Sequence, residues 1–168
     1  MVGRTPASEP NATAAPDPYA LREQHWPLLR RDPELTETAA VMAAELVRYL
    51  NHATNTATNT GANTALPYAS NLYTLLGHLA AAAHGMEQLC EQLNQRAAAL
   101  ATDPTLRHDG HRGSVTESEH AEDAAWRAVD WLAEAGMSAS YLGGTLRQAQ
   151  KQMTWLSHAA GLFEAGER

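Results

Sequence analysis

Residues 116–163 decide the fold, and they read TESEHAEDAAWRAVDWLAEAGMSASYLGGTLRQAQKQMTWLSHAAGLF. Within this stretch, apolar or small side chains recur at spacings that alternate between four and three residues without a slip. These side chains belong to Ala121, Ala125, Ala128, Leu132, Ala135, Ala139, Leu142, Leu146, Ala149, Met153, Leu156, Ala160 and Phe163. Such alternation is the 3.5-residue repeat of a coiled-coil seam, so it predicts one long helix. The stripe of that helix must be covered by the rest of the chain or by a second copy.

Three glycines, Gly136, Gly143 and Gly144, lie inside this expected helix. Each costs about 1 kcal/mol relative to alanine in a helix interior. A break near Gly136, with Ser138 as a new N-cap, would give four helices in place of three. Because the seam keeps its phase through all three glycines, we predict a single continuous helix.

Two further long helices are expected before this one. The first covers residues 32–53, because Asp32 supplies an N-cap acid and Pro33 suits the first helical position. The second covers residues 66–101 and has a seam of its own with the same alternating spacing. That seam consists of Ala69, Leu72, Leu76, Leu79, Ala83, Met86, Cys90, Leu93, Ala97 and Leu100.

Less regular stretches separate the predicted helices. Residues 1–17 are rich in proline and have no apolar period, so we expect a disordered tail. The segment 19–31 supports one or two turns of helix at most, because Pro27 interrupts it. Residues 54–64 repeat Asn-Thr and predict a polar linker, and residues 105–115 predict a turn.

The predicted fold is all-α: an elongated antiparallel bundle of three long coiled-coil-like helices, or four if the last one breaks near Gly136. Its single domain is expected over residues 18–163, with a C-terminal tail at residues 164–168. The three helices differ in length, at roughly 20, 35 and 45 residues by their apolar repeats. Part of the last helix therefore lacks cover within one chain, which favours self-association as a homodimer.

Composition restricts the classes of function. The 168 residues carry a formal net charge of -7, whereas nucleic-acid-binding domains are usually basic. No apolar run has the length of a membrane span or of a signal-peptide core. Cys90 is the single cysteine, so no intrachain disulfide can form, and we expect a cytoplasmic protein that binds neither nucleic acid nor membrane. Eleven of the twelve basic residues are arginine, as in a bacterial high-GC coding background.

Aromatic side chains on the last helix are candidate partner-binding residues. Trp126, Tyr141 and Trp155 fall in columns outside the seam, and Trp131 lies beside it. Aromatic residues are enriched among the buried anchors of protein interfaces. They predict a docking surface for a partner or a second copy. The alternative is that the helix over residues 32–53, or the segment around Trp26, covers them within the monomer.

Small residues form a further column on the last helix. Gly136 and Gly143 lie one heptad apart, in line with Val129 and Gln150. We expect this column to let a neighbouring backbone approach closely, with a ligand-sized gap as the alternative. Cys90 falls within the seam of the preceding helix, where a buried thiol behaves as a small apolar side chain.

Two groups of residues have spacings found in metal sites. His84, Glu87 and Glu91 share one face of the helix over residues 66–101 and could hold a metal with help from another helix. Glu117 and His120 form a Glu-x-x-His pair, but four-helix di-iron sites need two such pairs and two further glutamates. This chain has no second pair. For both groups the alternative is a solvated helix flank, and we expect no resident cofactor.

The turn before the last helix is a small basic cluster in an acidic protein. Arg107, His111 and Arg112 lie there with two glycines that free the backbone to approach an anion. They form a weak candidate site for a phosphate or an acidic partner, with an ordinary solvated turn as the alternative.

These features favour a non-enzymatic helical interaction protein: an adaptor, regulator or assembly component that works through coiled-coil-like surfaces. The alternative is a helical bundle that binds a metal or small ligand in its core, with ferritin-like oxidoreductase chemistry. A third and weaker hypothesis is nucleic-acid binding through residues 107–112, which would show as salt-sensitive binding. No motif in the chain places a nucleophile beside a base.

Overall fold

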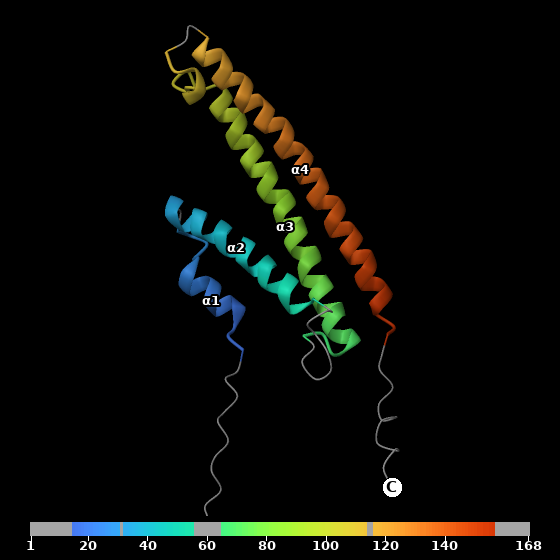
Figure 1. Ribbon diagram of the computed structural model, residues 1–168. Coiled ribbons are helices and arrows are strands. Elements are labelled where there is room, and N and C mark those ends of the chain that lie inside the picture. Colours follow the sequence, from blue (N-terminus) through green and yellow to red (C-terminus); the bar gives the residue numbers. More distant parts are fainter. Residues whose placement is uncertain (1–14, 31, 56–64, 114–115, 157–168) are drawn as a thin grey trace, which may run out of the picture. The chain divides into compact units, whose positions relative to one another are not determined.

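The computed structural model describes residues 15–30, 32–55, 65–113 and 116–156 (Figure 1). All secondary structure in these ranges is helical, which confirms the all-α prediction. Contacts divide the chain into two compact units, Met1–Thr64 and Ala65–Arg168. The predicted packing of the helix over residues 32–53 along the other two stays a prediction.

The first unit contains helix α1, Pro18–His25, and helix α2, Pro33–Ala53. The Asp32 side chain caps α2, since its Oδ1 accepts a hydrogen bond from the backbone N–H of Leu35 at 3.2 Å. This bond, together with a hydrogen bond from Arg30, holds the pKa of the Asp32 carboxyl below its usual range. The predicted start and end of this helix are therefore confirmed. Residues 1–14 of the expected tail at residues 1–17, residues 56–64 of the expected linker at residues 54–64, and the expected tail at residues 164–168 lie outside the described residues.

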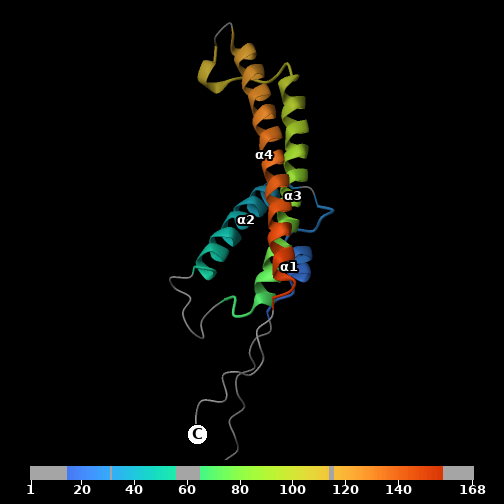
Figure 2. The same cartoon turned by 90° about the vertical axis from the view of Figure 1, so that its right-hand side faces the viewer.

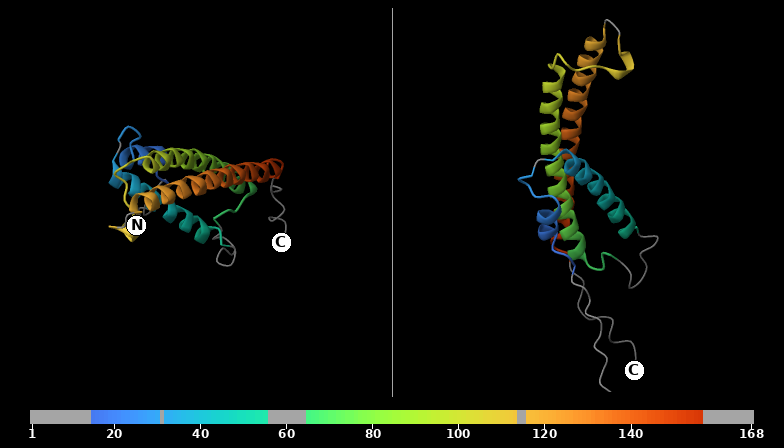
Figure 3. Two further views of the ribbon diagram at one scale, coloured as in Figure 1. Left: turned by 90° about the horizontal axis from the view of Figure 1, so that it is seen from above. Right: turned by 90° about the vertical axis from the view of Figure 1, so that its left-hand side faces the viewer.

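The second unit is a helical hairpin. Helix α3, Ala69–Ala101, is followed by the short 3₁₀ helix η2, Asp109–His111, and by helix α4, Glu117–Met153. The helices α3 and α4 lie side by side in every view (Figures 1, 2 and 3). They run antiparallel, because residues near the start of α3 meet residues near the end of α4.

Helix α4 is continuous through all three of its glycines, as the phase of the seam predicts. It is shorter than expected, because it ends at Met153 and the described residues 154–156 form a turn. The physical reason is the partner helix: Gln150 already meets Tyr73, close to the first residue of α3, so little cover remains beyond this point. The predicted helical residues 157–163 lie outside the described residues.

The start of α3 also differs by one turn from its prediction. The chain does not become helical until Ala69, with Tyr68 as N-cap. The Asn71 side chain accepts a hydrogen bond from the backbone N–H of Tyr68 at 3.1 Å, which satisfies an amide that the helix itself leaves open. Pro67 therefore lies just before the helix and not in its first turn.

Small residues fill the contact between α3 and α4. The buried residues of the hairpin are Ala80, Ala83, Cys90, Ala101, Ala121 and Gly143. The larger side chains of the predicted α3 seam are less covered, since Met86 is 52% exposed and Leu93 is 46% exposed. The seam prediction for α3 was thus right for the column of Ala83 and Cys90, which are buried. It was wrong for the column of Met86 and Leu93, because the contact uses the neighbouring column that contains Ala80.

The glycine column of α4 packs directly against α3, as expected. A Cβ atom added at Gly136 would lie 3.5 Å from the Cβ of Cys90 and 3.9 Å from the carbonyl oxygen of Glu87. A Cβ atom added at Gly143 would lie 2.9 Å from the Cε1 of His84, so that imidazole lies over the glycine. The close-packing interpretation of this column is therefore confirmed.

Polar side chains join the two helices at both ends of this column. Asn94 of α3 donates from Nδ2 to the carbonyl oxygen of Val129 on α4 at 2.6 Å. Gln150 of α4 donates from Nε2 to the carbonyl oxygen of Tyr73 on α3 at 3.2 Å. Because each bond runs from a side chain to a backbone atom of the other helix, the pair holds the two helices in register.

The hydrogen bond of Asn94 gives a first prediction. Asn94→Asp keeps the shape of the side chain but removes the donor, so the free energy of unfolding is expected to fall by about 1 kcal/mol. Urea denaturation followed by far-UV circular dichroism measures this loss. Gln95→Glu is the matched control, because it makes the same amide-to-carboxylate change at the exposed neighbour. Equal effects of the two substitutions would contradict the role of the bond.

Candidate interaction surface

The side of α4 that faces away from α3 carries most of the exposed aromatic residues of this helix. Tyr141 is two residues before Gly143, which places it about 200° around a helix of 3.6 residues per turn. Its side chain is 78% exposed. Met137 is 68% exposed on the same side, and Trp126, which is 43% exposed, lies about 100° from Gly143 at the edge of this side. An apolar surface of this kind is typical of a protein-binding site.

Trp155 extends this surface past the end of the helix. It lies two residues after Met153, and the intervening Thr154 keeps helical backbone angles, so the chain still follows the direction of α4. Trp155 is 89% exposed. Trp131 is also exposed, at 70%, and it borders a shallow hollow together with Asp130 and Glu134. Tyr141 and Trp155 are two heptads apart and so fall in one column, with Trp126 at the edge of the same surface.

We call this side the outer face of α4. Besides its aromatic residues it carries charged and small residues that no apolar repeat marks in the sequence. Its members are Trp126, Asp130, Glu134, Met137, Tyr141, Gly144, Arg147, Lys151 and Trp155, all of them exposed. Their columns are adjacent on the helix and cover an arc of about 140°.

Charge is divided unevenly along α4. Its first half holds six carboxylates and one arginine, whereas residues 135–156 contain no acidic residue and include Arg147 and Lys151. The helix dipole favours acids in the first turn and bases in the last, but its effect fades within one turn. The dipole therefore does not account for Asp130 and Glu134, which lie more than three turns into the helix.

The basic loop before α4 is largely neutralised by its own surroundings. Arg107 donates from Nη1 to the carbonyl oxygens of Pro104 and Leu106, each at 2.8 Å. Arg112 forms an ion pair with Asp109 at 2.9 Å. The backbone of His111 belongs to η2, but its side chain lies outside the description. Anion binding by this loop stays a prediction, and both described cations already have partners.

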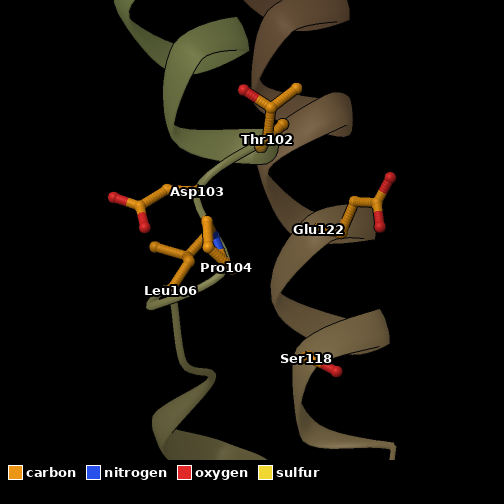
Figure 4. Close-up of a pocket in the computed structure, with 7 residues that line it drawn as sticks. Thr102, Asp103, Pro104, Leu106, Ser118 and Glu122 are labelled. Atoms are coloured by element: carbon orange, nitrogen blue, oxygen red, sulfur yellow. The ribbon is translucent and has the colours of Figure 1, made fainter.

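The same loop borders a small hollow beside the start of α4. Figure 4 shows Asp103 and Glu122 at opposite edges, and their carboxylates point away from each other. The hollow has a volume of about 190 Å³, below the usual range of ligand pockets. Hydrogen bonds from Thr105, with Arg96 and Arg107 nearby, hold the pKa of Asp103 below its usual range. The Asp103 carboxylate therefore stabilises the turn, and no pair of acids converges on the hollow.

The predicted metal group is only partly assembled. His84 Nδ1 lies 3.5 Å from the Oε2 of Glu87, and both side chains are almost half exposed. Glu87 and Glu91 border a shallow hollow against Gly136 of α4. In the part of the chain that the structure describes, no three His, Cys, Asp or Glu side chains come together as metal ligands. The second candidate pair is also engaged, since the Glu117 carboxylate accepts from the Gly113 N–H at 2.7 Å.

Comparisons of this chain with family models, with curated proteins and with solved structures returned no match. Among the described helices, none has an apolar stretch of the length needed to cross a lipid bilayer.

Some members of this surface carry signals that sequence reasoning missed. Met137 and Gly144 share the column of Asp130 and Lys151, one heptad apart from each other. Asp130 and Glu134 are spaced by four residues, as are Arg147 and Lys151, and like charges at this spacing repel each other on a helix. That spacing is visible in the sequence and could have marked the face.

Proposed function

We propose that this chain is a helical interaction protein, an adaptor, regulator or assembly component, that binds protein through the outer face of α4. The observation that carries the proposal is the exposure of Tyr141 and Trp155, at 78% and 89%, on the side of α4 turned away from α3. The proposal includes no enzymatic activity. It takes the cytoplasm as the place of action, because the single buried thiol of Cys90 requires no oxidising environment.

A second copy of the chain is the partner proposed first. The hairpin buries only small side chains between its helices, so its large apolar side chains still gain from burial against another molecule. Homodimers with two-fold symmetry are the commonest soluble oligomers, and they use one surface patch twice.

Truncation of the exposed aromatic residues tests this proposal. Tyr141→Ala and Trp155→Ala are each expected to weaken the dimer by about 30-fold, since anchor residues at interface centres are worth about 2 kcal/mol or more. Sedimentation equilibrium of the full-length chain measures the dissociation constant, and native mass spectrometry reports the number of subunits.

Met86→Ala on α3 is the control for these variants. It removes a large apolar side chain that is 52% exposed, but from the other helix of the hairpin, so it is expected to leave the dissociation constant unchanged. A dimer that is insensitive to Tyr141→Ala and Trp155→Ala, or sensitive to all three substitutions alike, would refute the outer face as the binding surface.

A further inference from the structure

The outer face of α4 has a charge pattern that is unfavourable within one chain. Asp130 and Glu134 lie one helical turn apart, and so do Arg147 and Lys151. In the described part of the chain, none of the four forms an ion pair. Each pair of like charges repels on the surface of the isolated hairpin. Both repulsions would be relieved by a partner that brings bases to the first pair and acids to the second.

The same face is complementary to a second copy of itself in the antiparallel orientation. Its residues form matched pairs around the midpoint between Ser140 and Tyr141. These pairs are Trp126 with Trp155, Asp130 with Lys151, Glu134 with Arg147, and Met137 with Gly144. Each acid is therefore paired with a base, each tryptophan with a tryptophan, and the large Met137 with a residue that has no side chain.

We infer that two copies of the chain pair through their α4 helices, antiparallel and with a two-fold axis near Ser140 and Tyr141. This inference rests on the proposed function and specifies its partner, orientation and register. In a two-fold interface every contact occurs twice, so Glu134 meets the partner's Arg147 while Arg147 meets the partner's Glu134.

Gly144 supports this arrangement independently of charge. A Cβ atom added at Gly144 would have no neighbour within 4 Å, so the packing of α3 does not require a glycine there. A glycine in a helix interior is unfavourable relative to alanine. Close approach of a second α4, with Met137 of the partner over Gly144, explains why a small residue stands at this exposed position.

Other registers lose the complementarity. A shift of one heptad in either direction places Glu134 opposite Ser140 or Thr154, neither of which carries a charge. A parallel arrangement places Glu134 opposite its own copy and Arg147 opposite its own copy, which brings like charges together. The antiparallel register centred near Ser140 is therefore the one that satisfies both acids and both bases.

Charge reversal tests the register. Glu134→Arg and Arg147→Glu, each alone, are expected to weaken the dimer roughly tenfold or more, because each replaces two attractive contacts by two repulsive ones. The double variant Glu134→Arg/Arg147→Glu restores both contacts and is expected to dimerise as the wild type does. An equimolar mixture of the two single variants is expected to form a heterodimer, because each reversed side chain then meets its opposite charge.

Neither charge reversal is expected to lower the stability of the isolated hairpin. Glu134→Arg turns the repulsion with Asp130 on the same helix into an attraction, and Arg147→Glu does the same beside Lys151. The isolated hairpin is therefore not weakened by either change. Arg96→Glu on α3 is the net-charge control for Arg147→Glu, since it makes the same substitution at an exposed position off the face.

A distance measurement tests the orientation. A nitroxide label at Glu119→Cys, in a chain that also carries Cys90→Ala, marks the start of α4. In the antiparallel dimer the two labels lie about 65 Å apart along the helix axes, at roughly 1.5 Å per residue. In a parallel dimer they lie within about 20 Å, or two helix diameters. Pulsed electron–electron double resonance distinguishes these distances.

The possible outcomes separate this inference from the proposed function. Rescue by the double variant together with the long label distance supports the register. A dimer that is lost in Tyr141→Ala but indifferent to charge reversal, or that shows the short distance, overturns the register and leaves the outer face as the binding surface. A wild-type chain that stays monomeric at its highest soluble concentration overturns the second copy as partner.

Discussion

Ala80→Asp is expected to lower the free energy of unfolding of the α3–α4 hairpin by about 3–5 kcal/mol. Ala80 is fully buried, with 0% exposure, and it lies in the same column of α3 as Asn94, whose side chain bonds to α4. A carboxylate at this position loses its hydration without gaining a cation or a hydrogen-bond donor designed to receive it. The contact between the helices must therefore open, or the carboxyl must take up a proton.

Urea denaturation followed by far-UV circular dichroism measures this loss. Ala82→Asp is the matched control, because it makes the same change two residues later on an exposed column of α3. The control bears only the lower helix propensity of aspartate, about half a kcal/mol. If the two variants unfold at the same urea concentration, Ala80 does not face the helix contact in solution.

Gly143→Leu is expected to have the second largest effect, a loss of about 2–3 kcal/mol. Gly143 is buried, and the imidazole of His84 occupies the space that its side chain would fill. The exposed ring of His84 can turn aside for a single methyl group, so Gly143→Ala is expected to cost much less. A leucine is too large for that adjustment, and it separates the helices.

The adjacent glycine provides the control. Gly144→Leu enters open space, and leucine has the higher helix propensity, so the monomer is expected to gain up to about 1 kcal/mol of stability. Thermal unfolding at a low protein concentration, where the chain is monomeric, compares the two substitutions. His84→Ala is expected to recover part of the loss in Gly143→Leu, and an absence of any coupling between them would contradict the packing of the imidazole on the glycine.

The continuity of α4 could be predicted from the sequence, whereas its C-terminal end could not. Its continuity through Gly136 follows from a seam that keeps its phase, because a turn would have reset the apolar spacing. Its end at Met153 could not be predicted from that spacing, since the seam continues to Phe163 in the sequence. The helix ends near the point where α3 no longer covers it. Where that cover ends depends on tertiary packing and not on the local sequence of α4.

The rotation of the helices was the harder problem. A 3.5-residue repeat establishes the period of a helix, but in an alanine-rich helix small residues occupy nearly every column. The column of Ala83 and Cys90 was predicted correctly. The column of Met86 and Leu93 was the natural second choice for the contact, whereas the structure uses the column of Ala80 because α4 approaches closely at Gly136 and Gly143.

The candidate surface could likewise be predicted only in part from the sequence. The outward position of Tyr141 and Trp155 follows from their distance from the seam, so the sequence predicts it. The engagement of Arg107 and Arg112 with nearby oxygens depends on the path of the loop, which no periodic pattern describes. The proposed pairing of residues around Ser140 could not be predicted from the apolar repeat, because it depends on which side of α4 is exposed.

The two cross-helix hydrogen bonds also indicate an order of folding. The bond from Asn94 to Val129 closes a segment of 35 residues, whereas the bond from Gln150 to Tyr73 spans 77 residues. Closing a longer loop costs more chain entropy, so the hairpin forms first beside the turn and then zips toward its open end. Opening proceeds in the reverse direction, and the end of α4 that carries Lys151 and Trp155 is the first to separate from α3.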